Sequence, residues 1–310
     1  MRGSLTIGGA SVTNQTPDRR SRLAAQRAAA RRARTRNRLL LAGGAIVAVI
    51  AVIVAFVVLQ ENGSSGNGNG PVAPSGAALA QLVRQATSVP TSTTDAVGAG
   101  QATTPPTSIT GAPLTGGGKP EMLYMGAEYC PYCAAERWAM VVALSRFGTF
   151  SGLATTHSAA KDGAGHAEPF PNTPTWTFAK ASFASQYLTF TPVEMQTNIP
   201  DPATGGYTNL QTPTPAQQAL FDKYDAAYQG AIPFIDFGNK YLSVGASYNP
   251  AVLSGLTWSQ IAADLHSPST PVAKSVLGAA NYLTAAICGL TNDQPTTACT
   301  ATVKSLRAKI

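Results

Sequence analysis

Residues 127–133 read Ala-Glu-Tyr-Cys-Pro-Tyr-Cys, and they place a Cys-x-x-Cys pair between a predicted strand and a predicted helix. The apolar run 122–125 predicts a short buried strand, and residues 134–146 predict a helix with apolar side chains gathered on one side. Cys130 is therefore expected at the N-cap of this helix. Pro131 is expected at the first helical position, where its missing N–H would have had no partner.

This arrangement is typical of a dithiol redox site. The free N–H groups of the first turn favour a thiolate, so Cys130 is the predicted nucleophile. Cys133, one turn further on and more buried, is the predicted resolving thiol. The residues expected to support the two sulfurs are Glu128, Tyr129, Pro131 and Tyr132. The same pattern also fits a structural disulfide or half of a zinc site, although zinc would need two further ligands.

The charge of the chain is unevenly distributed. Its 310 residues carry a net charge of +7, but the first 38 residues hold ten arginines against one aspartate, a net charge of +9. The rest of the chain has 12 basic and 14 acidic residues, a net charge of −2. A nucleic-acid binder is therefore not indicated by the overall basicity, because the positive charge belongs to one tail.

A predicted transmembrane helix explains this tail. Residues 39–59 are 21 consecutive residues without a charge, long enough to cross about 30 Å of hydrocarbon. Arginines before the span predict that residues 1–38 are cytoplasmic and that the chain after residue 59 is extracytoplasmic. A cleaved signal peptide would have a shorter apolar core, of about 7–15 residues, and a small-x-small cleavage site. We therefore expect a single-pass protein of the cell membrane, with a flexible Gly/Ser/Asn linker at 60–76.

All four cysteines follow the predicted span, in a compartment where disulfides persist. Their even number fits two intramolecular pairs. We expect Cys288 and Cys299 to form a structural disulfide that ties the last predicted helix to the C-terminal tail. A second possibility is that this pair exchanges electrons with Cys130 and Cys133.

The rest of the chain divides into segments with different signals. A short helix is expected at 77–86, within an otherwise extended N-terminal segment, 77–118, that lies on the domain. The folded core is expected to start near Lys119 and to run to residue 310. Residues 148–175 contain Gly, Pro and His and predict a long loop, and residues 185–194 alternate as a second strand.

Three later helices and one hairpin have clear start signals. Capping sequences predict helices at 215–228, 258–265 and 272–289, which begin after Thr214, Thr257 and Thr270. A proline-led strand after Pro233, a Gly-Asn turn and a returning strand at 241–246 predict an antiparallel hairpin.

This order of elements resembles the thioredoxin fold, and the Cys-Pro-Tyr-Cys motif is similar to that of glutaredoxins. The resemblance implies an α/β fold with a central mixed sheet flanked by helices. It also implies that Pro233 is a cis-proline facing the active-site sulfurs, with Ile232 offering its backbone to a bound substrate chain. The span from Cys133 to Pro233 is 100 residues, which implies a long insertion.

The ectodomain also resembles a membrane-anchored, thioredoxin-like family known as domain of unknown function 929. The resemblance rests on residues 126–138, 144–148, 233–241 and 279–288 and covers most of 85–300. In one departure from thioredoxins, Tyr124 stands where they have a buried aspartate that deprotonates the resolving thiol. Glu128 and Glu136 flank the site, and either is a candidate for the missing proton acceptor, although the sequence favours ordinary surface carboxylates.

The expected function is a thiol–disulfide oxidoreductase that acts on protein thiols or disulfides outside the cytoplasm. It needs no organic cofactor or metal, it binds no nucleic acid, and a membrane redox protein is its expected partner. One alternative is a non-catalytic binding module of the cell envelope. Another is a copper delivery protein, in which His157 or His166 would be the third ligand beside the two cysteines.

Overall fold

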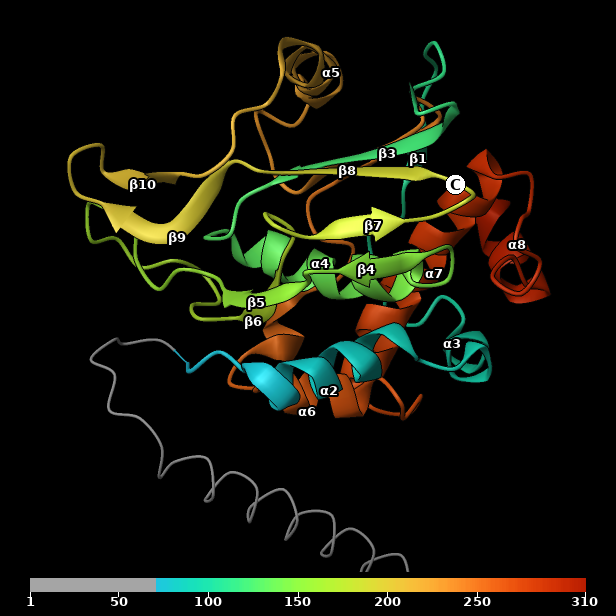
Figure 1. Ribbon diagram of the computed structural model, residues 1–310, viewed down its shortest axis with the longest axis horizontal. Coiled ribbons are helices and arrows are strands. Elements are labelled where there is room, and N and C mark those ends of the chain that lie inside the picture. The colour runs from blue at the N-terminus through green and yellow to red at the C-terminus, as the bar shows by residue number, and fades with distance from the viewer. Residues whose placement is uncertain (1–70) are drawn as a thin grey trace, which may run out of the picture. The chain divides into compact units, whose positions relative to one another are not determined.

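A mixed β-sheet organises the residues that the computed structural model describes, 71–310 (Figure 1). Six strands form this sheet in the order β1-β12-β11-β3-β2, and β8 also pairs with β3. β3 (Lys119–Gly126) runs parallel to β8 (Thr189–Glu194) and antiparallel to β11 (Phe234–Phe237). β12 (Tyr241–Val244) returns antiparallel to β11. The expected α/β architecture, a central mixed sheet flanked by helices, is therefore confirmed.

The other elements are α2 (Gly76–Thr87), α3 (Thr91–Val97), β1 (Thr107–Ser108), β2 (Thr115–Gly116), α4 (Pro131–Leu144), β4 (Thr149–Ser151), β5 (Ala154–His157), β6 (Pro174–Thr177), β7 (Ser182–Ala184), β9 (Gln196–Asp201), β10 (Gly206–Asn209), α5 (Pro215–Asp225), the 3₁₀ turn η1 (Pro250–Leu253), α6 (Trp258–Asp264), α7 (Pro271–Leu290) and α8 (Ala301–Arg307). None of the helices within 71–310 combines the length and the apolar character that a membrane span requires. The predicted tail, the predicted transmembrane helix and the linker as far as residue 70 lie outside the described residues.

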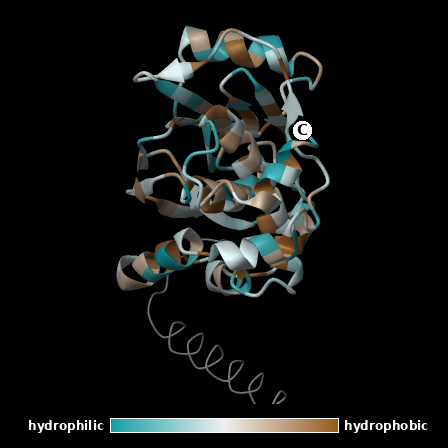
Figure 2. Cartoon of the chain, turned by 90° about the vertical axis from the view of Figure 1, so that its right-hand side faces the viewer, coloured by the Kyte–Doolittle hydropathy of each residue, from teal (hydrophilic) through white to brown (hydrophobic). Residues whose placement is uncertain are grey.

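The two faces of the sheet build two cores. Met122 and Tyr124 of β3 join a large cluster with α4 and α7, whereas Leu123 and Met125 join a smaller cluster on the side of α5. This is the period-2 alternation of a strand that is buried on both faces. Figure 1 shows α5 on one face of the sheet and α4 with α7 on the other, with α2 and α6 forming a further layer beyond them. The α5 helix at the top of Figure 2 carries both hydrophilic and hydrophobic bands, as expected for a helix with one face in water.

The three capping signals are confirmed. Thr214 and Thr257 each form a complete capping box with the glutamine three residues later, and Thr270 accepts a hydrogen bond from the N–H of Ala273. Each helix also has proline or tryptophan at its first position. These side chains satisfy N–H groups that would otherwise lack a partner, so the local sequence determines where each helix begins.

The predicted hairpin is also confirmed. Gly238 and Asn239 both adopt positive φ angles, 64° and 56°, in the three-residue loop 238–240 that joins β11 to β12. The turn places Phe237 opposite Tyr241 and Phe234 opposite Val244.

The prediction of a long loop over 148–175 is wrong. Three strands, β4, β5 and the start of β6, lie in this segment, and they pair as nested hairpins, β4 with β7 and β5 with β6. Distant side chains hold β6 in place, since the indole N–H of Trp138 donates to Pro174 O and that of Trp258 donates to Thr175 O, both at 2.8 Å. Tertiary hydrogen bonds of this kind leave no local signal in the sequence.

The short helix expected at 77–86 is confirmed by α2, but the prediction that the rest of 77–118 is extended is wrong. Residues 91–97 form α3, and the side chain amide of Asn281 donates to Thr94 O and to Gly98 O, both at 2.8 Å. The packed core also begins earlier than Lys119, because Leu82 of α2 is buried in the large cluster.

Candidate functional site

Cys130 stands at the junction between β3 and α4. It is the N-cap residue of α4, with extended backbone angles (φ −70°, ψ 121°), and Pro131 is the first helical residue, as expected. The Cys130 sulfur accepts a hydrogen bond from the N–H of Cys133 at 3.2 Å. Both side chains are free thiols, with Cys130 4% exposed and Cys133 fully buried. The sulfur of Cys130 therefore lies against the N-terminus of the helix, where a negative charge is favoured.

The two thiols differ in acidity. Burial on its own would raise the pKa of Cys130, but the thiol and the N–H of Cys133 outweigh it, helped by the Arg137 guanidinium and the N–H of Tyr132, and hold the pKa of Cys130 below its usual value. Burial and the neighbouring Cys130 sulfur raise the pKa of Cys133 well above its usual value. This asymmetry suits Cys130 as the thiolate and Cys133 as the protonated partner.

The strand β11 brings a proline to the same place. The Ile232–Pro233 peptide bond is cis, and the Cys130 thiol donates to the carbonyl of Ile232 at 3.7 Å. The loop after β12 holds this turn, since the N–H of Gly245 donates to Pro233 O at 2.8 Å. Residues 102 positions apart in the chain therefore meet at the Cys130 sulfur.

Aromatic side chains surround the motif. The Tyr129 ring stacks on Tyr207 of β10 with centroids 4.1 Å apart, and the Tyr207 hydroxyl donates to Glu168 at 2.6 Å. Tyr132, 40% exposed, meets the edge of Phe170 at 6.1 Å. The segment between α4 and β8 and the β9–β10 hairpin thus supply side chains beside the dithiol, and neither Tyr207 nor Phe170 was identified from the sequence.

The two flanking carboxylates have different settings. Glu136 is fully buried and is not an ordinary surface group, and its two oxygens accept hydrogen bonds from the N–H and the hydroxyl of Ser247, each at 2.8 Å. Glu128 is half-buried and accepts a hydrogen bond from the hydroxyl of Thr177 at 2.5 Å. Both carboxylates are therefore bound by hydrogen-bond donors other than the two thiols.

A buried charge pair lies under the site and was missed by sequence reasoning. Arg137 of α4 and Glu194 of β8 are both fully buried and form a two-pronged ion pair, with N–O distances of 2.9 Å and 2.6 Å. The one available signal was the position of Arg137 in a helix whose side chains are buried almost throughout. Its partner is 57 residues away, too far for a local pattern to reveal.

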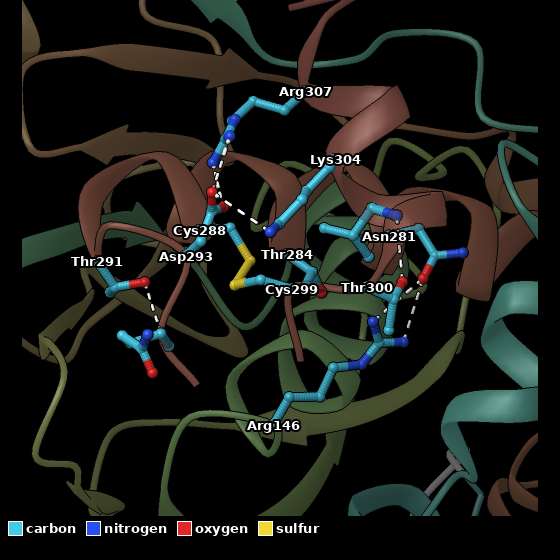
Figure 3. The surroundings of a disulfide bond; sticks show 12 residues. Arg146, Asn281, Thr284, Cys288, Thr291, Asp293, Cys299, Thr300, Lys304 and Arg307 are labelled. Atoms are coloured by element: carbon cyan, nitrogen blue, oxygen red, sulfur yellow. Dashed lines mark hydrogen bonds and ion pairs between the residues drawn. A yellow bond between two sulfur atoms is a disulfide. The ribbon is translucent and has the colours of Figure 1, made fainter. Parts of the chain in front are cut away.

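Cys288 and Cys299 form a disulfide, the pairing expected from the sequence (Figure 3). The bond joins the end of α7 to the residue just before the N-cap of α8. Beside it, Asp293 forms ion pairs with Arg307 and Lys304, at 2.5 Å and 3.7 Å.

Metal ligands are sparse in the described part of the chain. Within 71–310, the one group of three ligand-type residues at mutual ligand distances is Cys288, Asp293 and Cys299, and its two sulfurs are already bonded to each other. The Nδ1 atom of His157 lies 2.9 Å from Ser158 O, and that of His166 lies 2.9 Å from Asp162. The described residues thus bring neither histidine to ligand distance from both cysteines of the motif.

Comparison with known proteins yields one match. Residues 105–289 match the family described as a domain of unknown function (DUF929), a segment that includes the Cys-x-x-Cys motif, Pro233 and Cys288. No curated protein and no solved structure matches the chain.

Proposed function

The chain belongs to the DUF929 family, and we propose that it is a thioredoxin-like thiol–disulfide oxidoreductase that works outside the cytoplasm. One observation carries this proposal. The Cys130 sulfur, at the N-terminus of α4, contacts both the N–H of Cys133 and the carbonyl that precedes Pro233. The N–H of Cys133 and the helix N-terminus favour the thiolate of Cys130, and the resolving thiol lies one turn away.

The proposed reaction has two exchange steps. In the reducing direction the Cys130 thiolate attacks a partner disulfide, forms a mixed disulfide and releases the other partner sulfur, which takes up a proton. Cys133 then loses its proton to solvent, and its sulfur attacks Sγ of Cys130. The second partner sulfur leaves and is protonated, so two electrons and two protons have passed to the partner. The oxidising direction is the reverse.

The topology supports a thioredoxin-like fold. The strand order β12-β11-β3-β8, with β8 parallel to β3 and a helix after the Cys-x-x-Cys turn, matches the arrangement that the sequence resemblance implies. The residues between α4 and β8 form the insertion, and their hairpins β4–β7 and β5–β6 are nested within the crossover connection. We propose that Tyr132 and the neighbouring aromatic side chains contact the partner.

The proposed location completes the function. A single transmembrane helix at 39–59 would hold the domain beside membrane partners and raise its effective concentration there. The substrates would be thiols or disulfides of cell-envelope proteins, and a membrane redox protein would recycle the pair. The Cys288–Cys299 disulfide supports this location, because such bonds persist in oxidising compartments.

The test is the reduction potential of the Cys130–Cys133 pair in the full-length protein. The protein is equilibrated in glutathione buffers, its thiols are trapped, and the two cysteines are quantified by mass spectrometry. A potential of about −120 to −200 mV would mark an oxidase or isomerase, and one near about −270 mV a reductase. A potential well below about −300 mV would reject the proposal and favour a binding module with a structural disulfide.

A further inference from the structure

Arg137 and Glu194, the buried ion pair, also form hydrogen bonds with other residues. Besides the two bonds to Glu194, Nη2 of Arg137 donates to the carbonyl of Ala127 at 2.6 Å. Its guanidinium carbon lies 5.9 Å from the centroid of the Tyr124 ring. Glu194 in turn accepts a hydrogen bond from the N–H of Phe178 at 3.3 Å, so the carboxylate is fixed from the insertion as well.

Ala127 connects this pair to the dithiol. The same carbonyl that accepts from Arg137 also accepts from the N–H of Cys130 at 3.3 Å. The backbone N–H of Ala127 also lowers the pKa of the Cys133 thiol, against the larger effect of burial. One residue of the β3–α4 turn is thus bonded to the guanidinium on one side and directed to the two cysteines on the other.

Stability alone is a weak reason for such a pair. Taking both charges out of water costs several kcal/mol per ion, and apolar replacements of similar volume are often neutral or stabilising. Nη1 of Arg137 is buried and has no hydrogen-bond partner among the described residues, so the site holds a donor that the pair with Glu194 does not use.

We propose that Arg137 is a positioning residue of the dithiol, which holds the turn from Ala127 to Cys130 and places positive charge behind the two sulfurs. Glu194 orients the guanidinium. This inference rests on the proposed function and deepens it, because it identifies a buried group that assists the helix N-terminus in favouring the charged nucleophile. The other titratable or charged groups around the sulfurs are Tyr124 and Tyr129 before the motif, Glu194 of β8 and the two carboxylates Glu128 and Glu136.

The experiment measures the rate at which Cys130 is alkylated by iodoacetamide, as a function of pH, in the reduced full-length protein. Mass spectrometry identifies the modified cysteine. The midpoint is the pH at which the alkylation rate of Cys130 reaches half of its maximum. Arg137→Met is expected to raise this midpoint by about one pH unit, so that alkylation at a pH well below it slows about tenfold. Arg137→Lys keeps the charge without the planar fork, and its midpoint is expected between those of the wild type and Arg137→Met.

The variant Glu194→Gln distinguishes an electrostatic role of Arg137 from a purely structural one. It keeps an acceptor for Arg137 but removes the negative charge, so the guanidinium acts on the sulfurs without compensation and the midpoint is expected to move downward. A purely structural role would move the midpoint in the same direction in Arg137→Met and Glu194→Gln. That result, or equal midpoints in all the variants, would overturn the inference.

Two further variants serve as controls. Arg146→Met removes another arginine, which is half-buried, lies beyond the far end of α4 and donates to Asn281 at 3.2 Å, and it is expected to leave the midpoint unchanged. If Arg137→Met does not fold, the paired variant Arg137→Met with Glu194→Met leaves no lone buried charge and is expected to show a smaller upward shift, because the loss of the Glu194 charge offsets part of the loss of Arg137. The reduction potential of the Cys130–Cys133 pair distinguishes the two ideas. If that potential is well below about −300 mV but Arg137→Met and Glu194→Gln shift the midpoint in opposite directions, this inference is supported and the proposed function is rejected. If the potential lies between about −120 and −270 mV but the midpoint is the same in all the variants, the proposed function is supported and this inference is rejected.

Discussion

Cys130 and Cys133 show how much the position of a residue decides its chemistry. They lie one helical turn apart, yet the helix N-terminus and its N–H groups act on the first, while the second is enclosed beside it. The pKa of Cys130 is lowered and that of Cys133 is raised because of this difference in surroundings. The motif and its place at the N-cap were predictable, since both depend on residues within one turn.

The charged residues below the motif were not predictable in the same way. Arg137 and Glu194 meet because β8 lies parallel to β3, and the sequence separation between them includes the whole insertion. A single sequence carries no pairing information over that distance. The same holds for the contact between Cys130 and the carbonyl of Ile232. The family resemblance implied that Pro233 faces the sulfurs, but no local pattern in the sequence indicated this contact.

Glu136 provides a prediction at the residue scale. Burial raises its pKa from the usual 4.5 to about 7, against the opposing effect of the hydrogen bonds from Ser247. The folded state therefore keeps a proton that the unfolded state releases, so stability is lost as the pH rises from 4.5 to about 7. Glu136→Gln is expected to remove this loss, and its stability relative to the wild type should rise by up to about 3 kcal/mol across that range.

Denaturant unfolding at several pH values measures this effect, followed by the fluorescence of the three buried tryptophans. Ser247→Ala is the companion variant. It removes a hydroxyl that lowers the pKa of Glu136, so the loss of stability with rising pH should become larger and extend to higher pH. A stability difference between Glu136→Gln and the wild type that does not change with pH would contradict the assignment.

At the scale of elements, helices and strands differ in how far the sequence determines them. The helices α5, α6 and α7 begin where their threonine caps predict, because a cap acts on N–H groups within three residues. The strands of the insertion have only three or four residues each, and they exist through pairing with one another and through tryptophan hydrogen bonds. Short strands of this kind have no periodicity to detect.

The disulfide provides a prediction for the C-terminal elements. It links α7 to the start of α8 across a sequence separation of 11 residues, and both cysteines are buried. The double variant Cys288→Ala with Cys299→Ala is expected to lower the free energy of unfolding by about 3 kcal/mol, through the larger conformational freedom of its unfolded chain. The reduction potential of the Cys130–Cys133 pair should not change.

Two results bear on this assignment. Asp293→Asn removes the ion pairs to Arg307 and Lys304 without cutting the cross-link, and its cost should stay below about 1 kcal/mol because these groups are partly exposed. If the double variant is stably folded but no longer exchanges disulfides with a protein substrate, Cys288 and Cys299 belong to an electron relay and the structural role is wrong.

At the scale of the whole molecule, the fold and the proposed orientation in the membrane depend on different features of the sequence. The sheet forms because residues far apart in the chain share two cores, one on each of its faces. The proposed orientation in the membrane depends instead on composition, namely a block of arginine followed by an apolar run. The sequence was therefore sufficient to propose a compartment and a central mixed sheet, but not to predict the hairpins that build the insertion or the helix α3.

Orientation can be tested on intact cells. Protease added from outside is expected to digest the C-terminal domain of the wild-type protein and to leave a short N-terminal fragment protected. Replacing the arginines at 31, 32, 34, 36 and 38 with glutamate removes the positive charge beside the predicted span, so part of the protein should insert the other way round. Complete protection of the wild-type domain would rule out the extracytoplasmic location.

The same variant connects topology to chemistry. A domain held in the cytoplasm meets reducing conditions, so the molecules protected from protease should lack the Cys288–Cys299 disulfide, which thiol labelling reveals as two additional modified cysteines. Protected molecules that keep the disulfide would show that the bond forms independently of the compartment. In that case the disulfide would no longer support the proposed location, and the arginine block would be the remaining argument for it.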